Sequence, residues 1–332
     1  MQTCTLPGTD LALSRVGLGC WTIGRLWWGE DHDDGRAVRT VHAALDAGIN
    51  WVDTAPLYGH GHADRLLRTA LQGRSDVYVA TKVGVRWEGD HAVSDLRPAH
   101  VVADAEASLT RLGRERLDLL QVHWPCQTGT PIAATMEALT RLVEAGKVGA
   151  IGLCNFDAAA LAQARAVAPV TTLQTPLSLL RREYESRLAA EVQRPVGEPP
   201  LPVACLAYET LCRGLLAGRF TARPRFPDTD LRSRDDRFRG HRFDHARALV
   251  GDLERAARRV GLPVATLAVG WVLSRPGVAC AVVGARRPEQ IVETAAAAGL
   301  GRRRTLWSVV DQIAAAHGGW PRPPGVAAYT GG

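Results

Sequence analysis

The feature that most constrains the fold is a regular alternation of short apolar runs and amphipathic stretches along almost the whole chain. Eight runs are of β type, and most are nearly continuously apolar, as expected of parallel strands buried on both faces. They cover residues 14–21, 50–56, 77–83, 117–123, 148–155, 170–177, 202–209 and 277–284. Helical patterns separate them, for example at residues 35–48, 62–73, 98–112, 131–146 and 157–167.

Eight βα units in a chain of 332 residues predict an α/β fold, a (β/α)8 TIM barrel, with a single domain over residues 1–332. A doubly wound sheet is the alternative, and it would usually carry the pattern G-x-G-x-x-G after the first strand. Here Gly17-Leu18-Gly19 is followed by Cys20-Trp21-Thr22, which disfavours that alternative.

Two segments do not fit the simple alternation. A long polar loop rich in Arg, Asp and Phe follows the seventh strand, from Arg219 to about His245, and we expect it on the C-terminal face of the barrel. The last 30 or so residues predict an added helix at 305–317 and an irregular Gly/Pro-rich tail.

Composition narrows the functional classes. The net charge of +6 is spread along the chain, so it favours an anionic cofactor or substrate and does not indicate a nucleic-acid partner. Seven cysteines lie singly, without a CxxC pair, which predicts free thiols in a reducing cytoplasm. We find no signal-peptide pattern at the N-terminus and no apolar run of 18 residues, so no membrane partner is expected. The sequence makes no prediction of oligomeric state.

Lysine is scarce in this chain, since only Lys82 and Lys147 occur among 40 basic residues. Lys82 ends an apolar run, where a charged group is costly unless it is paired, and its compact ammonium has a pKa that shifts readily on burial. It is therefore the first candidate for an active-site residue. Lys147 follows Gly146 at the end of a helical pattern, where a cation suits the helix C-terminus.

Polar residues stand at or just beyond the ends of six apolar runs. In a barrel, catalytic groups come from the C-terminal ends of different strands, so these side chains are expected on one rim. They are Asp53, Tyr58, Lys82, His123, Asn155, Gln174 and Tyr208.

The residue types on this rim suit general acid chemistry. Tyr58 keeps its proton at neutral pH and could donate it, while a nearby Lys82 ammonium would lower the pKa of the phenol. Asp53 would keep Lys82 charged, and His123 could orient a carbonyl oxygen or relay a proton. With Lys and Tyr at the centre, no metal site is predicted. The acidic cluster 31–34 is interpreted as a helix start, and His60 with His62 as a loop.

The motifs around these residues resemble those of the aldo-keto reductase superfamily over nearly the full chain. The opening Gly17–Gly24 is typical of the bacterial branch related to the potassium-channel β-subunits. The matching motifs are Asp53-Thr54-Ala55-Pro56-Leu57-Tyr58-Gly59, Ala80-Thr81-Lys82-Val83, Val122-His123-Trp124-Pro125, Ile151-Gly152-Leu153-Cys154-Asn155-Phe156 and Gly284-Ala285-Arg286-Arg287-Pro288-Glu289-Gln290.

The resemblance implies an NADPH-dependent reductase of aldehydes or ketones with Asp53, Tyr58, Lys82 and His123 as its catalytic tetrad. Tyr58 would protonate the carbonyl oxygen. NADP is favoured over NAD because Arg286 would meet a 2′-phosphate. The further implied cofactor contacts are Cys20, Trp21, Asp53, Asn155, Gln174, Tyr208, Thr210, Leu211, Arg213, Gly214, Leu216, Gly284, Gln290, Glu293 and Thr294. Among these, Asn155 and Gln174 would hold the carboxamide, and Tyr208 would stack on the nicotinamide.

The substrate pocket is expected to be aromatic, formed by Trp21, Tyr58, Trp87, His123 and Trp124 with the long loops. Two other outcomes stay open: the same barrel used for imine or enone reduction or redox-neutral epimerisation, and a non-catalytic NADP-binding regulatory subunit. Several positions depart from the family pattern without touching the tetrad: Ala63, Asp64, Cys126, Cys154, Glu209, Thr210 and Thr294.

Overall fold

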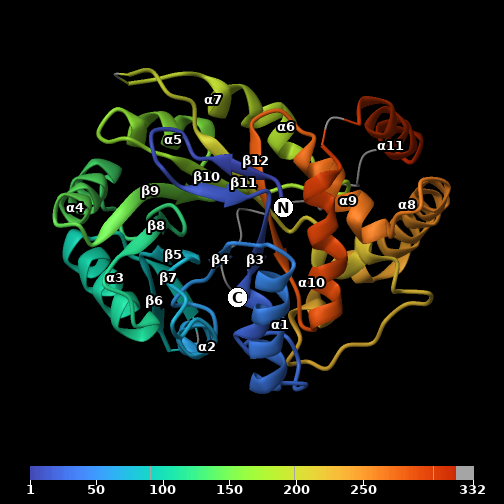
Figure 1. Ribbon diagram of the computed structural model, residues 1–332, viewed down its shortest axis with the longest axis horizontal. Coiled ribbons are helices and arrows are strands. Elements are labelled where there is room, and N and C mark those ends of the chain that lie inside the picture. The colour runs from blue at the N-terminus through green and yellow to red at the C-terminus, as the bar shows by residue number, and fades with distance from the viewer. Residues whose placement is uncertain (90, 198, 302, 319–332) are drawn as a thin grey trace.

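Eight parallel strands close into a barrel in the order β10-β11-β12-β3-β4-β5-β8-β9 (Figure 1). The computed structural model describes residues 1–89, 91–197, 199–301 and 303–318. The barrel strands are β3 (Val16–Gly19), β4 (Trp51–Asp53), β5 (Tyr78–Val83), β8 (Leu117–Val122), β9 (Val148–Cys154), β10 (Thr172–Pro176), β11 (Ala204–Tyr208) and β12 (Val278–Gly284). Each predicted apolar run contains one of these strands, and the (β/α)8 prediction is confirmed.

Helices ring the barrel on its outside (Figure 1). They are α1 (Asp34–Asp46), α2 (His62–Ala70), α3 (Pro98–Leu112), α4 (Ile132–Glu144), α5 (Ala158–Arg165), α6 (Glu183–Arg187), α7 (Ala189–Gln193), α8 (Gly240–Arg259), α9 (Val264–Leu273), α10 (Pro288–Ala295) and α11 (Arg304–Ala316). Their ends follow local chemistry. Asp33 caps α1 by accepting from the Arg36 amide, and α3 begins with Pro98 and ends at Gly113 in the left-handed conformation.

A hairpin of β1 (Thr3–Thr5) and β2 (Ala12–Ser14) lies across one end of the barrel, near the N-terminus in Figure 1. Its Leu6, Leu11 and Leu13 pack in one buried cluster with Leu119 and Leu206 of the barrel strands. This apolar plug was not predicted from the sequence. The polar residues stand at the C-terminal ends of the strands, at the other end of the barrel. There the β3–β4 register pairs the last residues of the two strands, Gly19 and Asp53.

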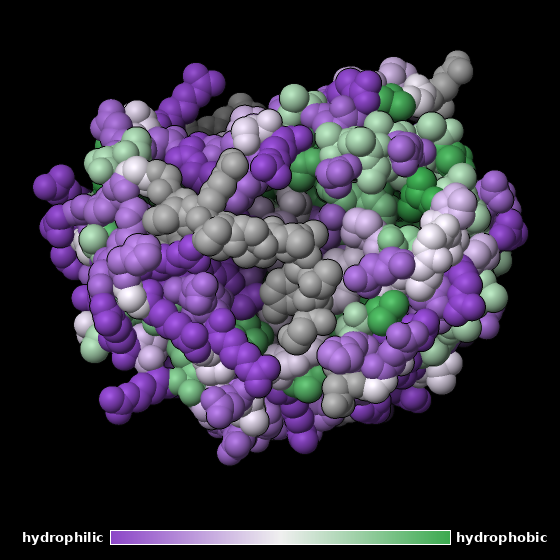
Figure 2. Space-filling model, turned by 180° about the vertical axis from the view of Figure 1, so that it is seen from behind, coloured by the Kyte–Doolittle hydropathy of each residue, from purple (hydrophilic) through white to green (hydrophobic). Residues whose placement is uncertain are grey.

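The loop after β11 runs from residue 219 to 239 and contains two short 3-10 turns, η3 (Leu231–Arg234) and η4 (Asp236–Phe238). We expected it to end near His245, but α8 already begins at Gly240. Figure 2 shows the face opposite to the hairpin, where hydrophilic side chains gather on the side that carries this loop and α8. A second unpredicted hairpin, β6 (Val85–Glu88) with β7 (His91–Ser94), follows β5.

The added C-terminal helix is α11, which begins and ends one residue before the predicted bounds of 305–317. The predicted Gly/Pro-rich tail from residue 319 lies outside the described residues. Within the part of the chain that is described, no single helix is long and apolar enough to cross a membrane, and only the pair α8 and α9, bent by 92°, meets that test when taken together.

Candidate active site

A cavity of about 1130 Å³ lies at the C-terminal ends of the barrel strands. Most of the predicted site residues line it: Cys20, Trp21, Asp53, Tyr58, His123, Trp124, Asn155, Gln174, Tyr208, Thr210, Leu211, Arg213, Gly214, Gly284, Arg286, Gln290, Glu293 and Thr294. Lys82 and Leu216 lie beneath the lining as fully buried side chains. The structure therefore brings the predicted residues, drawn from all eight strand ends or the loops that follow them, to one cavity.

The ammonium of Lys82 is the centre of the buried polar group at the base of the cavity. Its Nζ lies 2.5 Å from Asp53 Oδ1, 3.1 Å from the carbonyl oxygen of Thr54 and 3.2 Å from the hydroxyl of Tyr58. Lys82 and Asp53 are 0% and 2% exposed, respectively. Its three oxygen partners compensate the buried ammonium for the loss of water. Its direct contact with the Tyr58 hydroxyl lets it stabilise negative charge on that oxygen.

Tyr58 reaches this position because the loops after β3 and β4 touch each other. Gly59 has a φ of +65°, and a Cβ there would run into the carbonyl oxygen of Gly24. A Cβ on Gly24 would in turn lie 2.9 Å from the carbonyl carbon of Tyr58. Two glycines are thus required beside Tyr58, one of which is the last residue of the motif Asp53–Gly59.

Burial and the Lys82 charge set the protonation states around the site. Burial opposes the charge of Lys82, but Asp53 and Tyr58 outweigh it, so its pKa is raised. Burial also raises the pKa of Tyr58, while the Lys82 charge acts in the opposite direction. The pKa of His123 is lowered well below its usual value by burial and by Lys82. At neutral pH the site therefore holds a charged Lys82, a protonated Tyr58 and an uncharged His123.

Gln121 is a buried residue of this site that the sequence reasoning missed. Its Nε2 donates to Asp53 Oδ2 at 3.1 Å, and Gln174 Nε2 donates to the same oxygen at 2.8 Å. Together with Lys82 on Oδ1, these amides satisfy both carboxylate oxygens of Asp53. Gln121 stands two positions before His123, so strand alternation could have placed both on the inner face of β8.

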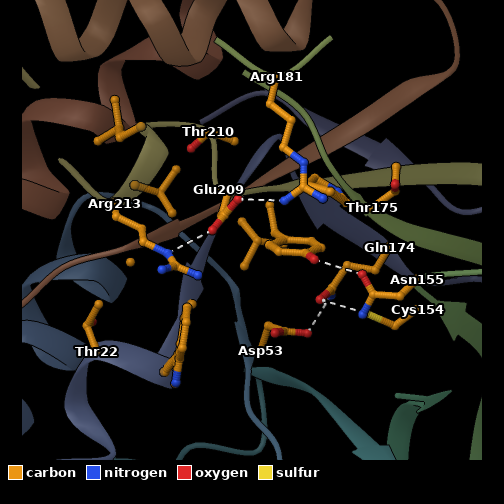
Figure 3. Close-up of a pocket in the computed structure, with 18 of the residues that line it drawn as sticks. Thr22, Asp53, Cys154, Asn155, Gln174, Thr175, Arg181, Glu209, Thr210 and Arg213 are labelled. Atoms are coloured by element: carbon orange, nitrogen blue, oxygen red, sulfur yellow. Dashed lines mark hydrogen bonds and ion pairs between the residues drawn. The ribbon is translucent and has the colours of Figure 1, made fainter. Parts of the chain in front are cut away.

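Asn155 directly follows β9 and has a φ of +64°. Its Nδ2 donates to the carbonyl oxygen of His123 at 3.1 Å and to Cys154 Sγ at 3.2 Å, and its Oδ1 accepts from the Tyr208 hydroxyl at 2.7 Å. Figure 3 shows Asn155, Gln174 and Asp53 turned toward the same space. The Cys154 thiol is buried, and burial raises its pKa to about 12.

The far end of the cavity is cationic. Arg286 is a quarter exposed, and its Nη2 donates to the carbonyl oxygen of Asp31 at 2.6 Å and lies 3.3 Å from Asp31 Oδ2. Gln290 Oε1 accepts from the backbone amides of Arg286 and Arg287, which fixes the start of α10. This end of the cavity can hold an anionic group.

Tryptophans form the wall beside Tyr58. Trp21 stacks on Tyr58 with ring centroids 6.4 Å apart, and Trp28 meets Trp21 edge-on at 5.2 Å. Trp27, Trp28 and Trp124 line the cavity. Trp87 does not line it, which corrects our expectation. It lies on the β6–β7 hairpin and packs against His60 and Trp27. Trp27 and Trp28, which follow β3, line the cavity, and the carbonyl oxygen of Trp27 accepts from the Leu231 amide at 2.9 Å.

The size and charge of the cavity fit a nicotinamide dinucleotide. Asp53 and Tyr58 line this space together with Arg213, Arg219 and Arg286. The three arginines match the phosphates of such a molecule, and the aromatic surface beside Tyr58 matches its ring. Among the described residues, no group of three or more His, Cys, Asp or Glu side chains could hold a metal ion.

Comparison with known proteins agrees with this geometry. Residues 15–304 match the model of the Aldo/keto reductase family. The chain is 37% identical to the aldo-keto reductase YhdN of Bacillus subtilis (strain 168), over 88% of this chain and 87% of that protein. It is 31% identical to an NADH-specific methylglyoxal reductase of Escherichia coli (strain K12), over 90% of this chain and 93% of that protein.

Among solved structures, the glycerol dehydrogenase AKR11B4 from Gluconobacter oxydans superposes with a TM-score of 0.86 and 39% identity, over 98% of this chain and 99% of that one. A family match over most of the chain, two relatives matched over most of their length and a shared barrel all lead to one assignment. The protein belongs to the aldo/keto reductase family, whose members are oxidoreductases that use a nicotinamide cofactor on small-molecule carbonyl compounds.

Proposed function

We propose that the protein reduces an aldehyde or a ketone to the alcohol with NADPH, and that Tyr58 is the general acid. The observation that carries this proposal is the position of the Lys82 ammonium, 2.5 Å from Asp53 and 3.2 Å from the Tyr58 hydroxyl. A phenol in contact with a cation can release its proton to an oxygen on which negative charge develops, because the cation stabilises the phenolate left behind.

The side chains around Tyr58 have matching tasks. His123 is uncharged and its ring meets that of Tyr58 edge-on, so it can orient the carbonyl oxygen without competing for the proton. Gln121 and Gln174 hold Asp53, which keeps Lys82 charged. Asn155 and Gln174 would hold the carboxamide of the cofactor, and Tyr208 would face its ring. When bound, the nicotinamide supplies the hydride to the carbonyl carbon.

The preference for NADPH rests on Arg286. Its guanidinium lies at the cationic end of the cavity, near Arg36, which shares Asp31 with it. The E. coli relative is NADH-specific, so the preference needs its own test. We expect Arg286→Gln to lower kcat/KM for NADPH about tenfold or more and to leave that for NADH unchanged, since only NADPH carries the extra phosphate. Equal losses with both cofactors would contradict the assignment of NADPH.

The aromatic wall and the named relatives limit the kind of substrate that we expect. Trp21, Trp28 and Trp124 offer flat apolar surfaces beside Tyr58. The two relatives named for their reactions act on methylglyoxal and on glycerol, which are both small oxygenated molecules. We infer a small uncharged carbonyl compound. All seven cysteines are unpaired, which supports the cytoplasm as the compartment.

Tyr58→Phe tests the mechanism. The variant keeps the ring and removes the proton donor, so turnover should fall by about 100-fold or more while the Kd for NADPH stays within about twofold of the wild type. Retained turnover would refute Tyr58 as the acid. If the wild-type protein bound NADPH tightly and reduced no member of a broad aldehyde and ketone panel, a regulatory role would replace catalysis.

A further inference from the structure

Asp64 is a buried carboxylate that the mechanism above does not use. It lies in the first turn of α2, and its side chain is fully buried. Its Oδ1 accepts from the hydroxyl of Thr54 at 2.8 Å, and its Oδ2 accepts from Arg111 Nε of α3 at 3.0 Å. Helices α2 and α3 lie side by side on the outside of the barrel (Figure 1). Both carboxylate oxygens of Asp64 thus have a partner.

Thr54 connects this carboxylate to the base of the cavity. It directly follows β4 and is fully buried, and its amide donates to the carbonyl oxygen of Ala80 on β5 at 2.9 Å. Its own carbonyl oxygen accepts from Lys82 Nζ at 3.1 Å. One residue therefore contacts Asp64 through its side chain and Lys82 through its main chain, so a shift of Thr54 moves an oxygen partner of the ammonium.

A second connection runs from α2 to Tyr58. The amide of Ala63, the residue before Asp64, donates to the carbonyl oxygen of Tyr58 at 3.2 Å. Asp64 is thus tied through the main chain to the residue that carries the proton, and through Thr54 to the residue that carries the charge. The contact of Lys82 Nζ with the Tyr58 hydroxyl at 3.2 Å closes this ring of contacts.

Arg111 holds the carboxylate from the side of α3. Its Nη2 donates to the hydroxyl of Ser108 at 2.8 Å, which fixes the guanidinium on its own helix. A Cβ on Gly61, the residue before α2, would lie 2.6 Å from Cδ of Arg111, so the arginine needs a glycine there. The position of Asp64 is therefore set by two helices as well as by Thr54.

We propose that Asp64 is a positioning residue that fixes the Thr54 carbonyl, and through it the Lys82 ammonium, against the hydroxyl of Tyr58. The inference rests on the proposed function, because it assigns a task within proton transfer from Tyr58. Without Asp64 the Thr54 hydroxyl would lose its acceptor, and the ammonium would follow Asp53, its partner at 2.5 Å. The contact with Tyr58 would then lengthen, and a displacement of about 1 Å at a catalytic group can slow a reaction about 100-fold.

A purely structural role for Asp64 predicts a different outcome. An acidic side chain in the first turn of a helix stabilises that helix, so its loss would lower the free energy of unfolding and leave the rate of the folded protein unchanged. Thr54→Val separates the two roles, because it keeps the shape of the side chain, removes the hydroxyl and leaves Asp64 in α2. Thr54→Ser keeps the hydroxyl.

Thr81→Val is the matched control. Thr81 is also fully buried and stands next to Lys82 on β5, and its hydroxyl has no hydrogen-bond partner among the described residues. The substitution therefore makes the same chemical change beside the same lysine without breaking a contact.

The experiment measures single-turnover hydride transfer from bound NADPH to the aldehyde that the wild type reduces fastest, the Kd for NADPH and unfolding in urea. We expect Thr54→Val and Asp64→Ala each to lower the rate about tenfold or more and to leave the Kd within about twofold of the wild type. The double variant should add little to either, because both remove one contact. Thr54→Ser should recover most of the rate, and Thr81→Val should match the wild type.

Thr54→Val decides the matter even if Asp64→Ala does not fold. A rate within about twofold of the wild type in Thr54→Val, whatever its stability, would overturn the positioning role and leave the proposed function standing. An equal loss of rate in Thr54→Ser or in Thr81→Val would also overturn it, because the hydroxyl would then not be the cause. A wild-type protein that reduced no aldehyde or ketone would refute the proposed function itself, and the inference with it.

Discussion

At the residue scale, the Lys82 ammonium shows why the chemistry depends on the kind of cation. A guanidinium needs a wide planar partner, whereas the space between Asp53 and Tyr58 accepts one compact Nζ that contacts both. The scarcity of lysine in the sequence pointed to this residue before any neighbour was known. Lys147, the other lysine, forms a half-exposed pair with Glu106 at 2.6 Å.

Lys82→Arg is therefore not a conservative change. We expect kcat for carbonyl reduction to fall more than about 100-fold. The larger guanidinium would disrupt the buried ion pair with Asp53 and lose the contact with the Tyr58 hydroxyl. Lys147→Arg provides the control and should leave kcat unchanged. A near-normal rate in Lys82→Arg would refute the role assigned to the ammonium.

The pH dependence follows from Tyr58 and His123. In the proposed mechanism, reduction requires Tyr58 with its proton, and its raised pKa keeps that form present through neutral pH. His123, with its lowered pKa, does not gain charge near its usual value. The single-turnover rate of reduction should thus stay flat from about pH 6 to 8, and alcohol oxidation, which needs the phenolate, should rise toward alkaline pH. A midpoint near pH 6.5 in the reduction profile would mean that His123 titrates.

At the element scale, the strand ends were predictable and the loops were not. Buried parallel strands produce long apolar runs, so Lys82 and His123 could be placed on their strands from the sequence alone. A backbone contact with the loop after β11 holds Trp27 and Trp28 at the cavity. The contacting residues are far apart in the sequence, so no local sequence pattern could have predicted it. The position of Trp87 was predicted wrongly for the same reason, since it depends on an unpredicted hairpin.

Asp104 on α3 is a partly buried carboxylate that lowers the stability of the fold at neutral pH. Its carboxylate accepts from the amide of Gly84, just after β5, at 3.0 Å, and burial raises its pKa to about 6. A raised carboxyl pKa means that the folded state binds the proton more tightly than the unfolded chain. Stability is therefore lost as pH rises from the unfolded value, about 3.9, through the folded one.

Asp104→Asn keeps the acceptor for Gly84 and removes the buried charge. We expect the free energy of unfolding at pH 7 to rise by about 1–2 kcal/mol, an amount reduced from the full linkage value because the side chain is partly exposed. At about pH 4 the difference from the wild type should shrink, because the folded carboxyl is then protonated and the unfolded one is about half protonated. Urea unfolding at the two pH values measures this. Equal stabilisation at both would exclude a charge effect.

At the scale of the whole molecule, the two ends of the barrel have separate tasks. Leu6, Leu11 and Leu13 of the N-terminal hairpin pack against the interior at one end, and the cavity opens at the other. The sequence predicted the barrel because the alternation of runs extends over nearly the whole chain. It did not predict the plug, since three-residue strands carry too little periodicity to be recognised.

The ion pairs of Glu209 also belong to this scale, because they join segments that are far apart in the chain. Arg181 and Arg237 reach one carboxylate from loops after different strands. The sequence showed Glu209 only as a departure from the family pattern. Its partners became visible when the barrel brought the loops together.

The central claim is hydride transfer to a carbonyl carbon with the proton supplied by Tyr58. Its most direct test is turnover of an aldehyde by the wild-type protein with NADPH deuterated at the transferring position of the nicotinamide. The account predicts one deuterium on the carbinol carbon of the alcohol, and loss of this product in Tyr58→Phe. Turnover that leaves the carbonyl carbon without deuterium, or a labelled alcohol formed at an undiminished rate by Tyr58→Phe, would contradict it.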